Sequence, residues 1–79
     1  MPVRAYVLFD VDPASDDVLE RLAHHSLGGC KVLASEIYPH EIIAGLEADR
    51  LEDFNTAMGE LAGEAGVLRT TTLRISTTP

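Results

Sequence analysis

The sequence contains very little cysteine. Cys30 is the only one, so no disulfide can form within the chain. A long apolar run is also missing, because no segment approaches the roughly 18 consecutive apolar residues of a transmembrane helix. The opening "MPVR" leads into a mixed stretch rather than the apolar core of a signal peptide. These absences predict a reducing compartment, the cytoplasm, and no membrane partner.

Positive charge is scarce as well. Six basic side chains stand against 13 acidic ones, which gives a net charge of −7. The basic residues are dispersed along the chain, at Arg4, Arg21, Lys31, Arg50, Arg69 and Arg74. Nucleic-acid binding depends on clustered lysines and arginines that neutralise phosphates. We therefore expect no direct contact with nucleic acid.

The usual motifs of metal sites and active sites are absent. No CxxC, HxxxH or HExxH spacing occurs, and the adjacent His24 and His25 would point about 100° apart on a helix. Ser26 beside these histidines diverges from them on a helix, and His40 diverges from Glu41 on a strand. A nucleophile needs a base within hydrogen-bond reach. The sequence therefore predicts no bound metal, no cofactor and no enzymatic activity.

The hydrophobic residues that are present recur with periods of 2 and of 3 to 4, which predict strands and helices respectively. The predicted elements are strand Val3–Val11, helix Asp16–Leu27, strand Lys31–Tyr38, strand Glu41–Glu47, helix Asp49–Gly66 and strand Val67–Ser76. Pro39 and His40 form a hairpin turn between the second and third strands. Asp49 and Glu52 have the spacing of a capping box at the start of the second helix.

The order β-α-β-β-α-β predicts an α+β fold of the ferredoxin-like type. In this sandwich a four-stranded antiparallel sheet carries both helices on one face. The first and third strands are expected to be central. Residues 1–79 contain no linker, repeat or low-complexity segment, so they are predicted to form a single domain.

Such a sandwich leaves one face of the sheet without helices. Tyr6, Leu8 and Ile43 are expected on that face if the alternate residues of their strands point toward the helices. Apolar groups there need a cover that this short chain does not contain. A second copy is the natural cover, so these residues are predicted to form a homodimer interface.

The threonine run Thr70–Thr72 has two interpretations. Threonine is favoured in strands for its β-propensity alone. Alternate threonines on one face also present hydroxyl groups that both donate and accept hydrogen bonds. Beside the hairpin with its carboxylate, such a row could hold a small zwitterion, and the pattern alone leaves both interpretations open.

Nearly the whole chain resembles a known family. The stretches "HEIIAGLEAD", "LEDFNTAMGELAGEAGV" and "GVLRTTTLRI", together with "AYVLFDVDP" near the start, resemble the ligand-binding (RAM) domain of the Lrp/AsnC, or feast/famine, regulators. The ending "GV..TTT.RI" is the most specific part. The resemblance implies a ferredoxin-like domain that dimerises through its sheet and often assembles into larger rings.

The resemblance also implies a binding site between dimers, near the hairpin, for an amino acid or a related effector. The positions that would line it are Tyr38, His40, Glu41, Asp49, Thr70 and Thr72. Tyr38 stands where the family usually has glycine, which predicts a different effector or a closed site. The chain starts directly at the effector domain and so resembles the stand-alone form that lacks the helix-turn-helix. Full-length Lrp/AsnC regulators are then its expected partners.

Together these observations predict a stand-alone domain that binds an amino acid-type effector, oligomerises and modulates transcription indirectly. Three alternatives remain open. The first is a pure oligomerisation module without a ligand. The second is a dimeric ferredoxin-like enzyme, an oxygenase or isomerase, with an enclosed pocket holding His24, His25 or His40. The third is an ACT-like amino acid-binding module, which shares the same order of elements.

Overall fold

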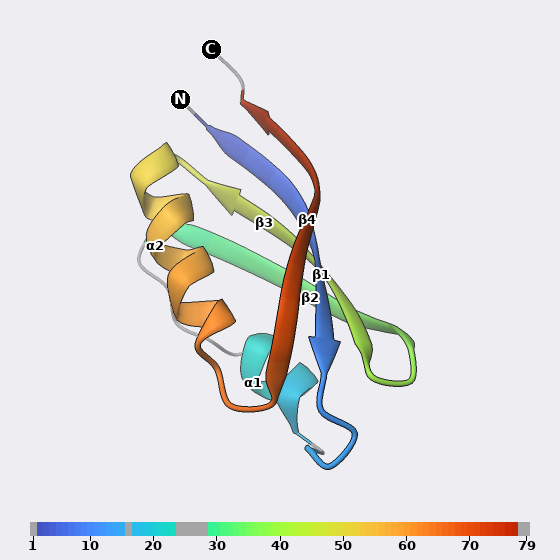
Figure 1. Ribbon diagram of the computed structural model, residues 1–79. Helices are drawn as coiled ribbons and strands as arrows, with labels where there is room; N and C mark the ends of the chain where they lie inside the picture. Colours follow the sequence, from blue (N-terminus) through green and yellow to red (C-terminus); the bar gives the residue numbers. More distant parts are fainter. Residues whose placement is uncertain (1, 16, 24–28, 78–79) are drawn as a thin grey trace.

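The computed structural model describes residues 2–15, 17–23 and 29–77. Within these ranges the elements are β1 (Val3–Val11), α1 (Val18–Ala23), β2 (Cys30–Tyr38), β3 (Glu41–Ala48), α2 (Leu51–Ala62) and β4 (Val67–Thr77). Both helices lie on the same side of the sheet (Figure 1). The predicted ferredoxin-like α+β fold is confirmed.

The four strands form one antiparallel sheet in the order β2-β3-β1-β4. β1 pairs with β3 on one side and with β4 on the other, so β1 and β3 are central, as predicted. Because β3 lies between β1 and β2, these two strands run in the same direction, and α1 connects them as a crossover. β2 and β4 are therefore the two edges of the sheet.

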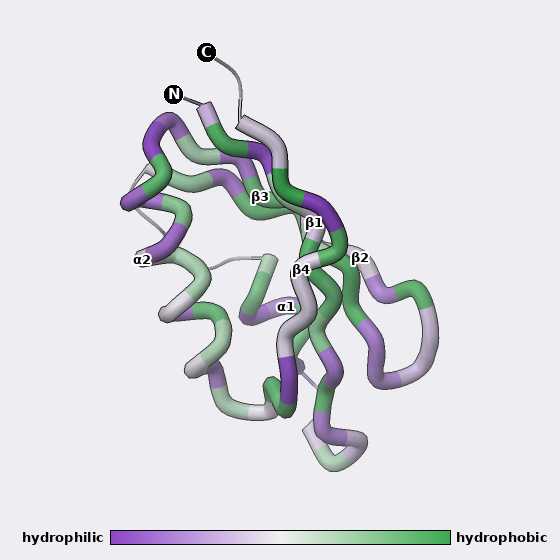
Figure 2. Tube along the Cα trace, turned by 45° about the horizontal axis from the view of Figure 1, so that its top comes forward, coloured by the Kyte–Doolittle hydropathy of each residue, from purple (hydrophilic) through white to green (hydrophobic). Residues whose placement is uncertain are grey.

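The core follows from the period-2 alternation of the central strands. The odd-numbered residues of β1 from Val3 to Val11 and the even-numbered residues of β3 from Ile42 to Ala48 are buried. The helices cover them with Val18 and Leu22 of α1 and with Phe54, Ala57 and Leu61 of α2. Figure 2 shows hydrophobic and hydrophilic stretches alternating along α2, as an amphipathic helix requires.

The predicted bounds of the helices change in the structure. The described part of the first helix is Val18–Ala23, and Asp16 and residues 24–27 of the prediction lie outside the described ranges. The second helix begins after Arg50 and ends at Ala62, before Gly66.

The predicted capping box at the start of α2 is wrong. Arg50, whose backbone is extended, occupies the N-cap position, so Asp49 lies one residue too early and makes no cap hydrogen bond. Arg50 instead pairs with Glu52 at 2.7 Å and with Asp53 at 3.2 Å. The acidic first turn of α2 therefore neutralises an arginine and also complements the helix dipole.

Gly66 connects α2 to β4 in a conformation that favours glycine. Its φ is +92°, and an added Cβ would lie 2.6 Å from Val18 Cγ2 and 2.8 Å from Ser15 Oγ. The backbone carbonyl of Gly66 also accepts a hydrogen bond from the amide of Asp12 at 2.8 Å. The turn before β4 is thus packed directly against the turn after β1.

Substitution of Gly66 by alanine is expected to lower the free energy of unfolding by about 2–3 kcal/mol, because the left-handed conformation and the overlap with Val18 both become unfavourable. Gly59→Ala is the matched control. It lies inside α2 with nothing within 4 Å of an added Cβ, so it is expected to gain about 0.5–1 kcal/mol. Urea unfolding of both variants measures the difference, and equal stabilities would refute this account of the turn.

Candidate functional site

The helix-free side of the sheet, called here the open face, is built from the positions that alternate with the core. The pairing places these residues in rows across the strands. One central row contains Leu33, Gly45, Tyr6 and Arg74, and the next contains Ser35, Ile43, Leu8 and Thr71. Tyr6 is 55% exposed and Leu33 81% exposed. The residues predicted for a dimer interface, Tyr6, Leu8 and Ile43, therefore all lie on this face.

Charged rows border this apolar centre at both ends. At the end where β1 begins, Glu47 stands between Arg4 and Lys31, and Arg4 Nε lies 3.5 Å from Glu47 Oε2. Two cations and one carboxylate give this row a net charge of +1. These side chains are exposed, so the ion pair contributes little stability.

The opposite row carries the opposite charge. Asp10 stands between Glu41 and Arg69, and Arg69 Nη2 lies 2.8 Å from Asp10 Oδ2. Two carboxylates and one cation make the net charge −1. The open face is therefore apolar in the middle over β2, β3 and β1, with Arg74 beside it on the edge strand β4, and it is positive at one end and negative at the other.

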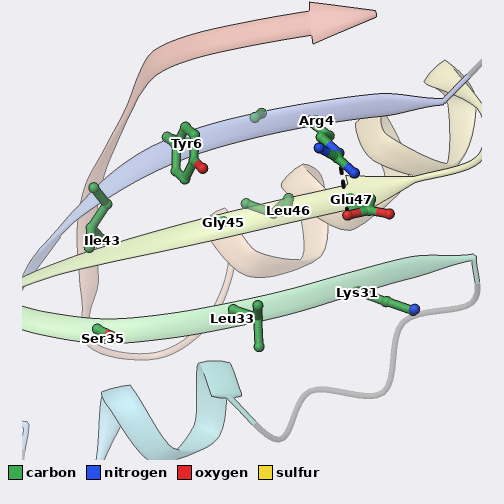
Figure 3. Close-up of a pocket in the computed structure, with 10 residues that line it drawn as sticks. Arg4, Tyr6, Lys31, Leu33, Ser35, Ile43, Gly45, Leu46 and Glu47 are labelled. Atoms are coloured by element: carbon green, nitrogen blue, oxygen red, sulfur yellow. Dashed lines mark ion pairs between the residues drawn. The ribbon is translucent and has the colours of Figure 1, made fainter. Parts of the chain in front are cut away.

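A groove of about 500 Å³ crosses the open face over β1, β3 and β2 (Figure 3). Gly45 forms its floor, because the missing side chain leaves a gap between Tyr6 and Leu33. The ring of Tyr6 leans from β1 toward β3, and its Cε1 would lie 3.6 Å from a Cβ added to Gly45. Arg4, Glu47 and Lys31 lie together at one end of the groove.

A second, much smaller cavity lies beside the hairpin between β2 and β3. Its volume is about 50 Å³, room for little more than a water molecule. Polar groups of Ser15, Glu36 and His40 line it together with the apolar residues Val11, Val18, Leu19 and Ile42. Tyr38, which is 66% exposed, and Glu41 are not among the lining residues.

The predicted ligand residues do not converge within one chain. Tyr38, His40 and Glu41 share the hairpin, but Asp49 follows the far end of β3. Thr70 and Thr72 pair with Phe9 and Val7, whose side chains face the helices. Thr70 and Thr72 thus lie on the opposite face from Glu41. A site containing all six needs more than one chain, and their role as ligands stays a prediction.

The described residues contain no group of three or more His, Cys, Asp or Glu side chains arranged to hold a metal ion. His24, His25 and Ser26 lie outside the described ranges. Burial raises the pKa of the Cys30 thiol, and the carboxylate of Asp53 adds to this effect. The raised pKa disfavours the thiolate, which is the nucleophilic form of cysteine.

Residues of the groove were only partly foreseeable. Alternation along the strands predicts Tyr6 and Ile43 on the open face. The sequence predicts no site role for Lys31, Leu33, Ser35 or Gly45. A glycine inside a strand is one available signal, because it often marks a close approach to the backbone. Lys31, Leu33 and Ser35 join the groove through the register of β2 against β3, which no local pattern of the sequence specifies.

Comparisons with protein-family models, with curated proteins and with solved structures find no match to this chain. The resemblance to Lrp/AsnC effector domains therefore stays an interpretation of the sequence. In the part of the chain that the structure describes, no helix is long and apolar enough to cross a membrane.

His40 adopts a backbone conformation that is unusual for a residue with a side chain. Its φ is +67°, directly after Pro39, which is the pattern of a type II turn, where glycine is preferred at this position. The carbonyl of His40 accepts a hydrogen bond from the amide of Val11 at 2.9 Å, which holds the turn against the end of β1.

Replacing His40 by glycine is expected to raise the free energy of unfolding by about 0.5–1 kcal/mol. Relief of the left-handed conformation gains about 1–2 kcal/mol, and the flexibility of glycine in the unfolded chain costs about 0.5–1 kcal/mol. His40→Ala is the control, because alanine keeps the strain and is expected to gain nothing. Thermal unfolding of the pair measures the difference, and a glycine variant no more stable than the alanine variant would contradict the expectation.

Proposed function

We propose that this chain is a cytoplasmic, self-associating domain that binds an amino acid-type effector and modulates transcription indirectly, without catalysis. The observation that carries the proposal is the open face. Tyr6, Leu33 and the half-buried Leu8 and Ile43 form an apolar centre that no described element covers. A contiguous apolar patch bordered by charges is typical of a protein interface.

The size of the open face supports self-association. Four strands about 4.8 Å apart and about eight residues long present about 500 Å² in projection. Side-chain relief raises the accessible area toward the roughly 800 Å² per partner of a stable interface. A two-fold axis in the plane of contact would let each copy cover the other with the same residues.

The effector part of the proposal rests on the resemblance to Lrp/AsnC effector domains. The strained His40 and the small cavity beside it lie at the hairpin, where that resemblance expects the ligand. Because the six expected ligand residues do not converge within one chain, the site would form between dimers. The net charge of −7 disfavours direct contact with DNA, so regulation would act through full-length Lrp/AsnC partners.

Two measurements test this function. Sedimentation velocity of the full chain over a range of concentrations is expected to show a dimer or a larger closed assembly. A thermal-shift screen with the twenty amino acids is expected to give a rise in melting temperature with one or a few of them, since a ligand that binds only the folded state stabilises it. A monomer at all concentrations contradicts self-association, and no shift with any amino acid contradicts the effector.

A pure oligomerisation module is the second candidate. The cavity beside His40, at about 50 Å³, is far smaller than the roughly 300–1,000 Å³ of typical ligand pockets. This candidate is favoured if the chain associates and no amino acid changes its melting temperature.

A further inference from the structure

The groove on the open face has the size and composition of a small-molecule site. Its volume of about 500 Å³ lies within the range of roughly 300–1,000 Å³ that is usual for ligand pockets. It crosses three strands, and its floor exists because position 45 is glycine. Placement on paired strands keeps its walls in a defined geometry, which favours binding.

The side chains divide the groove into an apolar part and a positive end. Tyr6, Leu33 and Ile43 supply apolar walls over β1, β2 and β3. At the other end Glu47 is paired with Arg4, whereas the ammonium group of Lys31 has no ion-pair partner among the described residues. The groove therefore presents one uncompensated positive charge next to apolar surface.

We propose that this groove binds a small carboxylate with an aromatic or branched apolar body. The carboxylate lies at Lys31, and the body lies over Gly45 between Tyr6 and Leu33. Such a ligand matches both parts of the groove, because it covers apolar surface and supplies the missing negative charge. The site differs from the hairpin site of the proposed function.

Self-association would strengthen this site. A second copy packed on the open face would cover the groove and turn it into an enclosed cavity. Only this covering by a second copy rests on the proposed function. Enclosing the Lys31 ammonium without an anion is unfavourable, because a buried unpaired charge is costly. A bound carboxylate removes that cost, so ligand binding and association are expected to reinforce each other.

Nuclear magnetic resonance of the full chain tests the proposal with three probes: 3-phenylpropanoate, the uncharged 3-phenylpropanamide and L-phenylalanine. Titration with 3-phenylpropanoate is expected to shift the Gly45 amide and the Tyr6 ring resonances to saturation. The amide should bind about ten-fold more weakly, because it lacks the charge. L-Phenylalanine binding more tightly than 3-phenylpropanoate also supports the site and assigns its ammonium group to Glu47.

Matched variants separate charge from shape. Lys31→Gln is expected to weaken 3-phenylpropanoate binding about ten-fold and to leave the amide unchanged. Arg74→Gln is the control, because Arg74 is an exposed cation of the open face that does not line the groove. Gly45→Val, which fills the floor, is expected to prevent binding of all three probes, and its circular dichroism spectrum checks that the variant is folded.

Two results would overturn the proposal. The first is the absence of shifts at Gly45 and Tyr6 with every probe. The second is a set of intermolecular contacts, in the ligand-free protein, that place a side chain of a second copy inside the groove. Sedimentation is measured separately, so a monomer that binds 3-phenylpropanoate supports the groove and contradicts self-association.

Discussion

Phe9→Ala is expected to lower the free energy of unfolding by about 3–5 kcal/mol. Phe9 is fully buried on the central strand β1, on the side of the sheet that carries the helices, with Ile42 and Thr70 as its neighbours on the flanking strands. Removing a buried phenylalanine side chain costs about 3–5 kcal/mol, because transfer energy is lost and a cavity remains. A domain of this size has a total stability of about 4–12 kcal/mol, so the loss takes a large share of it.

The controls for this prediction separate burial from mere size. Phe9→Leu retains most of the volume and is expected to lose about 1–1.5 kcal/mol. Leu33→Ala removes a large but exposed apolar side chain on the other face and is expected to change the stability of the monomer by less than about 0.5 kcal/mol. Guanidinium unfolding followed by circular dichroism gives all three values. An alanine variant at position 9 that unfolds cooperatively with nearly unchanged stability would show that the core is centred elsewhere.

Ile43→Lys is expected to convert the associated protein into folded monomers. Ile43 lies near the centre of the open face, where a two-fold interface would bring the lysines of both copies into the same apolar region. Burying an unpaired charge costs at least about 3 kcal/mol, which raises the dissociation constant by a factor of more than about 100. In the monomer the lysine can extend its ammonium group into water, so the fold itself is retained.

Leu51→Lys is the matched control for the interface. Leu51 is 51% exposed at the start of α2, which packs on the covered side of the sheet. It introduces the same charge away from the open face, so the sedimentation coefficient is expected to stay at the wild-type value. A variant at position 43 that sediments like the wild type would place the contact between chains elsewhere, for example along the edge strands.

Much of the fold was predictable because its signals are local. The strict alternation of β1 and β3 indicates which side chains are buried, and the predicted strand Val3–Val11 has the observed bounds. The position of the second helix also follows from its amphipathic pattern. The first residue of this helix did not follow from the pattern, because Asp49 and Arg50 can both occupy the position before a helix. In the structure Arg50 is the N-cap, and its guanidinium group forms ion pairs with Glu52 and Asp53.

The candidate site was less predictable because it depends on register. β4 pairs with β1 through two register shifts, between Tyr6 and Val7 and between Asp10 and Val11, and these decide which threonines face the helices. No sequence pattern of this chain specifies such shifts. For this reason the six residues expected around a ligand could be named from the resemblance but not placed relative to one another.

The amino-acid sequence by itself determined the order of elements, the acidic character and the presence of apolar residues without a cover, since composition and periodicity are properties of the chain alone. Only the tertiary structure decided that Gly45 lies between Tyr6 and Leu33 and that Glu47 lies between Arg4 and Lys31. These neighbours are far apart in sequence and meet only through the pairing of three strands. The groove and its positive end are therefore products of the sheet rather than of any single segment.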